Sequence, residues 1–137
     1  GLFYFVDRKK SIIRRSGENI SALEVEAVLK DCPDVTGVAV TPVHDALRGE
    51  EVFAFVVARP GVGTGEDARA LVTAAARHLS YHKVPGYVAF VDRLPLGSTQ
   101  KLLRGQLRGD AQAALDAGLA HDLRDAKGAL RKMVSAG

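Results

Sequence analysis

The apolar run Val52–Ala58 (VFAFVVA) constrains the fold more than any other part of this chain. Its side chains would be apolar on both faces of a strand, and such a strand belongs in the middle of a sheet. Val35–Val43 predicts one neighbouring strand and Tyr87–Val91 predicts another. The intervening polar segment His44–Glu51 (HDALRGEE) predicts a loop. A sheet of three strands, with the buried strand between two neighbours, is therefore the expected core.

Two helices are expected to cover this sheet. Ser21, followed three residues later by Glu24, is typical of a capping box, and it predicts a helix through about Lys30. We expect that helix to bury Leu23, Ala27 and Val28. Apolar residues at helical spacing, which would share one side of a helix, predict the second helix over Asp67–Leu79.

A small hairpin is expected at the N-terminal end. Leu2–Val6 and Ser11–Arg14 predict two short strands, joined by the charged segment Asp7–Lys10. The next four residues, Ser16–Asn19 (SGEN), predict a turn in which Gly17 takes a positive φ. The fold class predicted is α+β, with an N-terminal β-hairpin followed by a three-stranded mixed sheet under two helices.

The chain is expected to divide into a domain at 1–109 and a helical or partly disordered tail at 110–137. Composition shifts at Asp110 towards Ala, Asp, Leu, Arg and Lys, and four leucines approximate a helical stripe that docks elsewhere or frays. The members of this stripe are Leu115, Leu119, Leu123 and Leu130. Because Gly1 is not a start methionine and a strand is predicted at once, we expect a fragment of a larger protein.

Composition narrows the classes of function. Cys32 is the single cysteine, so no internal disulfide or CxxC zinc pair is possible. The four histidines form no HExxH motif, and no metal site is predicted. No apolar run approaches the ~20 residues that span a bilayer, and no signal peptide is evident. We therefore expect a cytoplasmic protein without a transmembrane segment.

Basic residues crowd the first fifteen positions, although the net charge of the chain is only +3. Such a cluster suits a nucleotide, a coenzyme phosphate or RNA, and it equally suits a solvated hairpin face. A second cation, Lys101, follows a Gly/Ser/Thr-containing loop, where it could reach an anionic reaction centre. The members of the first cluster are Arg8, Lys9, Lys10, Arg14 and Arg15.

Four segments, in order and with the expected gaps, resemble the C-terminal domain of the adenylate-forming (AMP-binding) enzymes. They are GLFYFVDRKKSIIRRSGENISALEVE, DALRGEEVFAFVV, YHKVPGYVAFVDRLP and the loop ending in KLLR. The SGEN form is similar to fatty-acid and carnitine-type CoA ligases within the acyl-CoA synthetases. The Lys101 loop departs from the usual family pattern at Leu96, Gly97 and Gln100.

The resemblance implies a ligase that works in two steps. A carboxylic acid and ATP give an acyl adenylate, and coenzyme A then displaces AMP. ATP and CoA are substrates, and Mg²⁺ is expected through an N-terminal adenylation domain of the same chain. The small domain would swing between two poses, one for each step, so the fragment alone is expected to be inactive.

Functional residues follow from the same resemblance. Lys101 matches the lysine that serves the adenylation step, and Lys10 falls on the hinge position. Arg8 matches an arginine near the AMP ribose and phosphate. The turn Ser16, Gly17 and Glu18 matches the lining of the CoA path.

The alternative is a nonenzymatic α+β module that binds nucleic acid or another partner through the basic hairpin. An RNA-binding sheet would carry aromatic residues on its central strands. Phe3, Tyr4 and Phe5 lie together in the first predicted strand, and no second aromatic motif matches them. The ligase interpretation, with no nucleic-acid partner, is therefore preferred.

Overall fold

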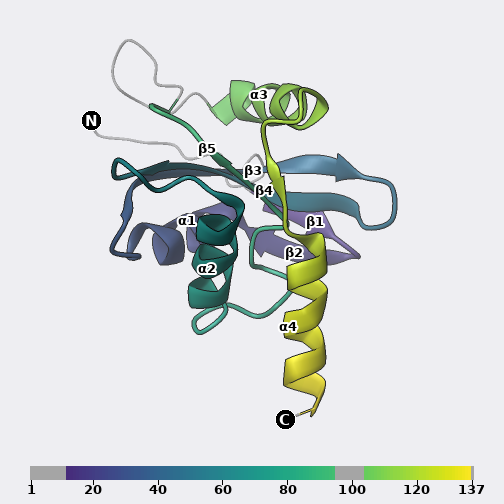
Figure 1. Cartoon of the computed structure of the whole chain (residues 1–137). Coiled ribbons are helices and arrows are strands. Elements are labelled where there is room, and N and C mark those ends of the chain that lie inside the picture. Colours follow the sequence, from purple (N-terminus) through teal and green to yellow (C-terminus); the bar gives the residue numbers. More distant parts are fainter. Residues whose placement is uncertain (1–11, 95–103, 137) are drawn as a thin grey trace, which may run out of the picture.

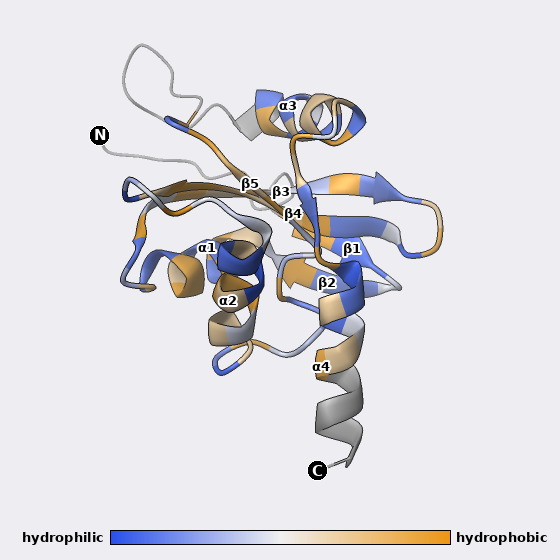
Figure 2. Cartoon of the chain, in the orientation of Figure 1, coloured by the Kyte–Doolittle hydropathy of each residue, from blue (hydrophilic) through white to orange (hydrophobic). Residues whose placement is uncertain are grey.

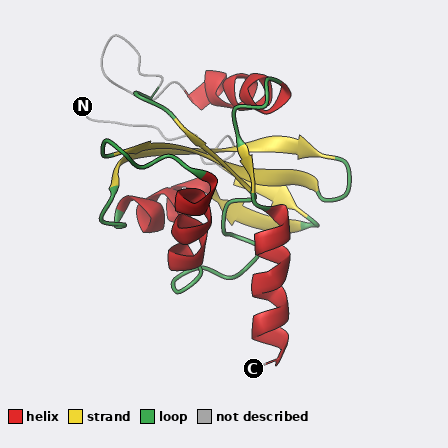
Figure 3. Cartoon of the chain, viewed as in Figure 1, coloured by secondary structure: helices red, strands yellow, loops and turns green. Residues whose placement is uncertain are grey.

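The computed structural model describes residues 12–94 and 104–136, and in this part of the chain it contains one mixed sheet and four helices (Figure 3). The α+β fold class is confirmed. The elements are β1 Ile12–Arg15, β2 Glu18–Ser21, α1 Ala22–Lys30, β3 Val35–Asp45, β4 Gly49–Ala58, α2 Gly65–Ala75, β5 Tyr87–Phe90, α3 Arg104–Asp116, β6 His121–Asp122 and α4 Arg124–Ala136.

Strand β4 lies in the middle of the sheet, as its apolar sequence predicts. It pairs with β3 in antiparallel and with β5 in parallel orientation, and its start meets β1 at the Arg15–Gly49 pair. The sheet has six strands in the order β2-β1-β4-β5-β6, with β3 also on β4. It exceeds the three strands expected because β1 and β2 join it and β6 adds to β5. Strand β2 was not predicted, because the turn expected over Ser16–Asn19 takes only Ser16 and Gly17 and the chain is extended again from Glu18.

The side chains of β4 alternate between two apolar clusters. Val52, Ala54 and Val56 belong to the cluster under α1 and α2, which Leu123 also joins. Phe53 and Phe55 belong to the cluster under α3 on the opposite face. Figure 1 shows α3 on one side of the sheet and α1, α2 and α4 on the other, and Figure 2 shows the apolar strands between them. This period of two gives a strand buried on both faces.

Helix α1 begins and ends where the sequence predicts. The Ser21 side chain accepts a hydrogen bond from the Glu24 N–H at 3.3 Å. The buried face, however, is Ala22, Val25 and Leu29. Of the predicted face only Val28 packs on the core, half-buried, whereas Leu23 is 37% exposed and Ala27 is exposed, so those two were wrong. Because α1 follows β2 without a loop, the strand sets its rotation.

Helix α2 is shorter than predicted. Thr64 caps it, and the Asp67 carboxylate accepts hydrogen bonds from the Gly63 and Thr64 N–H groups at 2.8 and 2.9 Å. The helix ends at Ala75, but Leu79 remains buried in the turn that follows. The capping box formed by Thr64 and Asp67 therefore starts α2 at Gly65, two residues before the predicted start at Asp67.

The C-terminal segment packs against the sheet. Helix α3 runs through the expected boundary at residues 109 and 110, and α3 is followed by Gly118 at φ +74°. Leu119 is 69% exposed, whereas Leu123 is buried beside α4, so the four leucines do not form one stripe. In the described residues, no helix combines the length and apolarity needed to cross a membrane.

Candidate functional site

Three of the six residues predicted to act in function lie outside the described residues. These are Lys101, Lys10 and Arg8. The first predicted strand of the N-terminal hairpin, Leu2–Val6, also lies outside them. The other three, Ser16, Gly17 and Glu18, form the turn between β1 and β2 and the first residue of β2.

The turn is a two-residue hairpin loop closed by the Arg15–Glu18 pair. Ser16 has φ +53° and Gly17 has φ +82°, and positive φ at both positions matches the twist of a β-hairpin. A Cβ built on Gly17 would meet no atom within 4 Å. Gly17 thus gives the turn its conformation and leaves open space above the backbone.

The turn is fastened to the connection between β3 and β4. The Ser16 N–H donates to the Arg48 carbonyl at 2.8 Å, and the Arg48 guanidinium donates to the Ser16 Oγ at 3.4 Å. The Asp45 carboxylate accepts from the Leu47 and Arg48 N–H groups at 2.9 and 2.8 Å. Burial acts to raise the pKa of Asp45, but these N–H groups and the Arg124 guanidinium outweigh it and lower the pKa.

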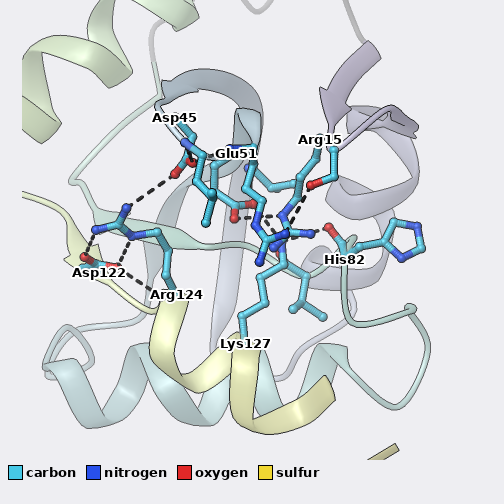
Figure 4. Close-up of polar contacts among 12 residues, drawn as sticks. Arg15, Asp45, Glu51, His82, Asp122, Arg124 and Lys127 are labelled. Carbon is cyan, nitrogen blue, oxygen red and sulfur yellow. Dashed lines mark hydrogen bonds and ion pairs between the residues drawn. The ribbon is translucent and has the colours of Figure 1, made fainter. Parts of the chain in front are cut away.

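Beneath the turn lie three charged side chains, Arg15, Glu51 and Lys127, which we call the buried ion cluster (Figure 4). Arg15 Nε donates to Glu51 Oε1 at 2.9 Å, and Lys127 Nζ donates to Glu51 Oε2 at 2.8 Å. The Glu51 and Lys127 side chains are each 1% exposed. The sequence predicted Glu51 to lie in a polar loop, which is wrong, because β3 and β4 extend to within three residues of each other.

Backbone groups complete this cluster. Lys127 Nζ also donates to the His82 and Val84 carbonyls at 2.8 and 2.7 Å, and Glu51 Oε2 accepts from the Val52 N–H at 2.7 Å. An ammonium group has three donors, and each has an acceptor here. Burial lowers the pKa of Lys127 to about 8, against the opposing effect of Glu51.

Three neighbours, Gly86, His82 and Tyr81, surround the cluster. A Cβ on Gly86 would lie 2.6 Å from Glu51 Cδ and Cγ, so only glycine lets the backbone pass so close to this side chain. Burial lowers the pKa of His82, and Glu18 at the end of the turn acts in the opposite direction. The Arg15 guanidinium lies 6.0 Å from the centre of the Tyr81 ring.

A second set of charges, Asp45, Asp122 and Arg124, is called the rim cluster here, because the Arg124 and Asp122 side chains are each 50% exposed, while Asp45 beneath them is 4% exposed. Arg124 Nη2 donates to Asp122 Oδ2 at 2.8 Å, and Arg124 Nη1 lies 3.4 Å from Asp45 Oδ2. Hydrogen bonding from Arg124 lowers the pKa of Asp122. The Arg124 guanidinium also lies 5.2 Å from the centre of the Tyr87 ring. The two clusters connect the start of α4 to the strands below the turn.

Other features of the described residues do not form a catalytic centre. Within residues 12–94 and 104–136, no group of three or more His, Cys, Asp or Glu side chains could hold a metal ion. Burial, followed by the nearby Asp31 and Asp34 carboxylates, raises the pKa of the Cys32 thiol. An apolar groove of about 560 Å³ beside Tyr81 and Leu130 is not lined by the turn.

Sequence reasoning missed the buried ion cluster, although one signal for it was present. Leu123 and Leu130 are two apolar members of a helical stripe, and Lys127 occupies the position four residues after Leu123. A lysine in the middle of an apolar stripe needs a buried acidic partner. Glu51, at the start of the apolar strand β4, is that partner.

Comparison with known proteins identifies the domain. Residues 24–101 match the profile of the AMP-binding enzyme C-terminal domain. The chain is 41% identical to 2-succinylbenzoate–CoA ligase of Geobacillus kaustophilus over 108 residues, which are 79% of this chain and 22% of the ligase. It is 36% identical to crotonobetaine/carnitine–CoA ligase of Proteus mirabilis, covering 79% of this chain and 20% of that enzyme.

Solved structures agree with this relationship. The o-succinylbenzoate CoA synthetase of Bacillus subtilis in complex with its acyl-adenylate intermediate superposes with a TM-score of 0.65 at 36% identity. The match covers 76% of this chain and 21% of the synthetase. The chain thus spans about a fifth of the length of the relatives it matches. It belongs to the family of AMP-binding enzyme C-terminal domains.

Proposed function

We propose that this chain is the mobile C-terminal lid of an ATP-dependent, AMP-forming acyl-CoA synthetase. The match of residues 24–101 to the family profile, which ends at the predicted catalytic lysine, carries the proposal. The relatives named as CoA ligases and the synthetase that holds an acyl adenylate support it. Residues 1–109 would form the lid and residues 110–137 an extension of it.

The reaction has two steps. A carboxylate oxygen of the acid attacks the α-phosphorus of ATP, and the bond from that phosphorus to the bridging oxygen breaks and releases pyrophosphate. The sulfur of CoA then attacks the acyl carbonyl carbon, the bond from this carbon to the AMP oxygen breaks, and the thiol proton is released. An N-terminal adenylation domain would hold ATP, the acid and Mg²⁺.

Lys101 serves the first step in this proposal. A lysine ammonium directed at the carboxylate and phosphate oxygens stabilises the negative charge that develops between them. Lys10 is the hinge at which a few dihedral angles swing the lid, and Arg8 contacts the ribose and phosphate of AMP. These three roles rest on the position of each residue in the family motifs.

The Ser16–Gly17–Glu18 turn serves the second step by lining the CoA path. Its open space above Gly17 would let the pantetheine arm approach the backbone closely. The fastening of the turn to Arg48 supports this role, because a lining surface must keep its shape as the arm passes.

Two half reactions of the full-length enzyme test the role of Lys101. We expect Lys101→Ala to lower acid-dependent pyrophosphate exchange by about 10²–10³, the effect of losing one transition-state donor. Thioester formation from a supplied acyl adenylate should be largely retained. Lys30→Ala, an exposed lysine at the end of α1, is the matched control and should leave both rates unchanged. Equal loss of both half reactions would contradict the assignment.

The binding-module alternative is not favoured, because the family and the named relatives are ligases. A titration with single-stranded RNA at several salt concentrations distinguishes the two. The ligase proposal predicts weak binding that disappears at moderate salt. Tight binding that survives would support the alternative.

A further inference from the structure

Lys127 reaches from α4 into the body of the domain and connects α4 to two segments there (Figure 4). Its ammonium bonds to the Glu51 side chain of β4 and to the backbone carbonyls of His82 and Val84, in the segment before β5. All three donors are occupied, and the side chain is 1% exposed. Because it is so enclosed, Lys127 cannot contact a substrate, and any effect on the reaction must pass through its partners.

Glu51 connects Lys127 to the Ser16–Gly17–Glu18 turn through Arg15. Its second carboxylate oxygen holds Arg15, which is the residue directly before Ser16. The neighbouring Glu50 accepts from the Arg14 N–H at 2.8 Å, so both residues that lead into the turn are tied to the start of β4. The turn is tied to Arg48 three residues before Glu51.

The charges in this cluster make the connection stiff. Two cations share one carboxylate in a site without solvent, where charge-assisted hydrogen bonds are strong and an unpaired charge is costly. If Lys127 were replaced by a side chain without donors, Glu51 would keep Arg15 and the Val52 N–H but lose its contact with α4. The carboxylate could then move, and Arg15 would move with it.

We propose that Lys127 is a positioning residue for thioester formation, which fixes Glu51 and Arg15 and thereby holds the Ser16–Gly17–Glu18 turn in the shape that passes the CoA arm. This inference rests on the proposed function, since it needs the turn to line the CoA path. It gives the C-terminal extension a part in the second half reaction and none in the first.

Lys127→Met in the full-length enzyme tests the inference. We expect thioester formation from a supplied acyl adenylate to fall about tenfold, mainly through a higher KM for CoA, as for a lost positioning contact. Pyrophosphate exchange should stay within about twofold of the wild-type rate. Lys30→Met, which removes an exposed lysine, should change neither. Hydrogen exchange of the peptide over residues 12–21 should be faster in Lys127→Met, because the Ser16 N–H loses protection.

The outcomes separate the possible failures. Unchanged thioester formation in folded Lys127→Met, or equal loss in both half reactions, overturns the positioning role. If Lys127→Met does not fold, Lys127→Gln, which keeps two amide donors, takes its place and is judged by the same split. A wild-type enzyme that makes no acyl adenylate from any acid would instead refute the proposed function.

Discussion

Helix α4 is held to the domain at two points that use the same chemistry in different surroundings. In the buried ion cluster, Lys127 and Glu51 are each 1% exposed. In the rim cluster, the side chains of Arg124 and Asp122 are each 50% exposed. Both pairs have nitrogen–oxygen distances of 2.8 Å, so distance alone does not distinguish them.

Exposure to solvent distinguishes the contributions that the two clusters make to stability. Water screens the rim pair and can replace either partner, so its contribution to stability is small. The buried pair cannot exchange with water, and each charge depends on its partner for solvation. The buried cluster should therefore fix the position of α4 and of the turn, while the rim cluster adds little.

Glu51→Gln should give the largest effect, because it leaves two cations, Arg15 and Lys127, without a counter-charge in the interior. We expect the free energy of unfolding to fall by about 3–5 kcal/mol, the cost of breaking a buried pair on one side. Urea denaturation followed by circular dichroism measures it.

Glu50→Gln is the matched control for this change. Glu50 precedes Glu51 on the same strand, but its partner Arg108 is 55% exposed. We expect a loss of about 1 kcal/mol or less. Similar losses for the two variants would show that burial does not decide the strength of these pairs.

The pH dependence of stability should differ between Lys127 of the buried ion cluster and Arg124 of the rim cluster. Burial lowers the pKa of Lys127 to about 8, in the presence of Glu51, Arg15 and Arg48. An unfolded lysine keeps its proton to about pH 10.4, so between these values the unfolded chain binds more protons and stability rises with pH. The stability of the wild type relative to Lys127→Met should increase by about 1–2 kcal/mol between pH 7 and pH 9.5.

Arg124 provides the control for this titration. The hydrogen bond that Arg124 donates to Asp122 raises the pKa of Arg124, so Arg124 stays charged throughout this range. The stability difference between wild type and Arg124→Gln should be constant over the same pH interval in urea denaturation. A constant difference for Lys127→Met as well would mean that Lys127 does not titrate as its burial predicts.

Arg124→Gln itself should have the smallest effect. Water can take the place of Arg124 at Asp122, which is 50% exposed, and Asp45, although its side chain is only 4% exposed, keeps its bonds from the Leu47 and Arg48 N–H groups. We therefore expect a loss of about 0–1 kcal/mol. The thermal midpoint measures this change. A loss as large as that of Glu51→Gln would remove the distinction between the two clusters.

The sequence predicted those parts of the fold that depend on residues close together in the chain. The apolar run of β4, the cap at Ser21 and the turn at Gly17 each carry their own signal, and all three are confirmed. The same holds for the α+β class, which follows from the order of the elements.

Local pattern did not pair the members of the buried ion cluster, because the two bonded pairs are 36 and 76 residues apart in the sequence. Patterns treat Glu51 and Lys127 as polar and place them on the surface. Only the tertiary fold brings the two charges together and makes their burial tolerable. The face of α1 was misjudged for a related reason, since its rotation depends on β2 and the sheet.

The most direct test of the account compares two variants of the full-length enzyme in both half reactions. Lys101→Ala should lose pyrophosphate exchange and retain thioester formation, as stated above. Gly17→Leu, which places a side chain in the open space of the turn and strains the backbone at φ +82°, should lose thioester formation and retain exchange. This crossed pattern is the result we predict. Loss of the same half reaction in both variants would contradict the assignment of Lys101 and the turn to separate steps.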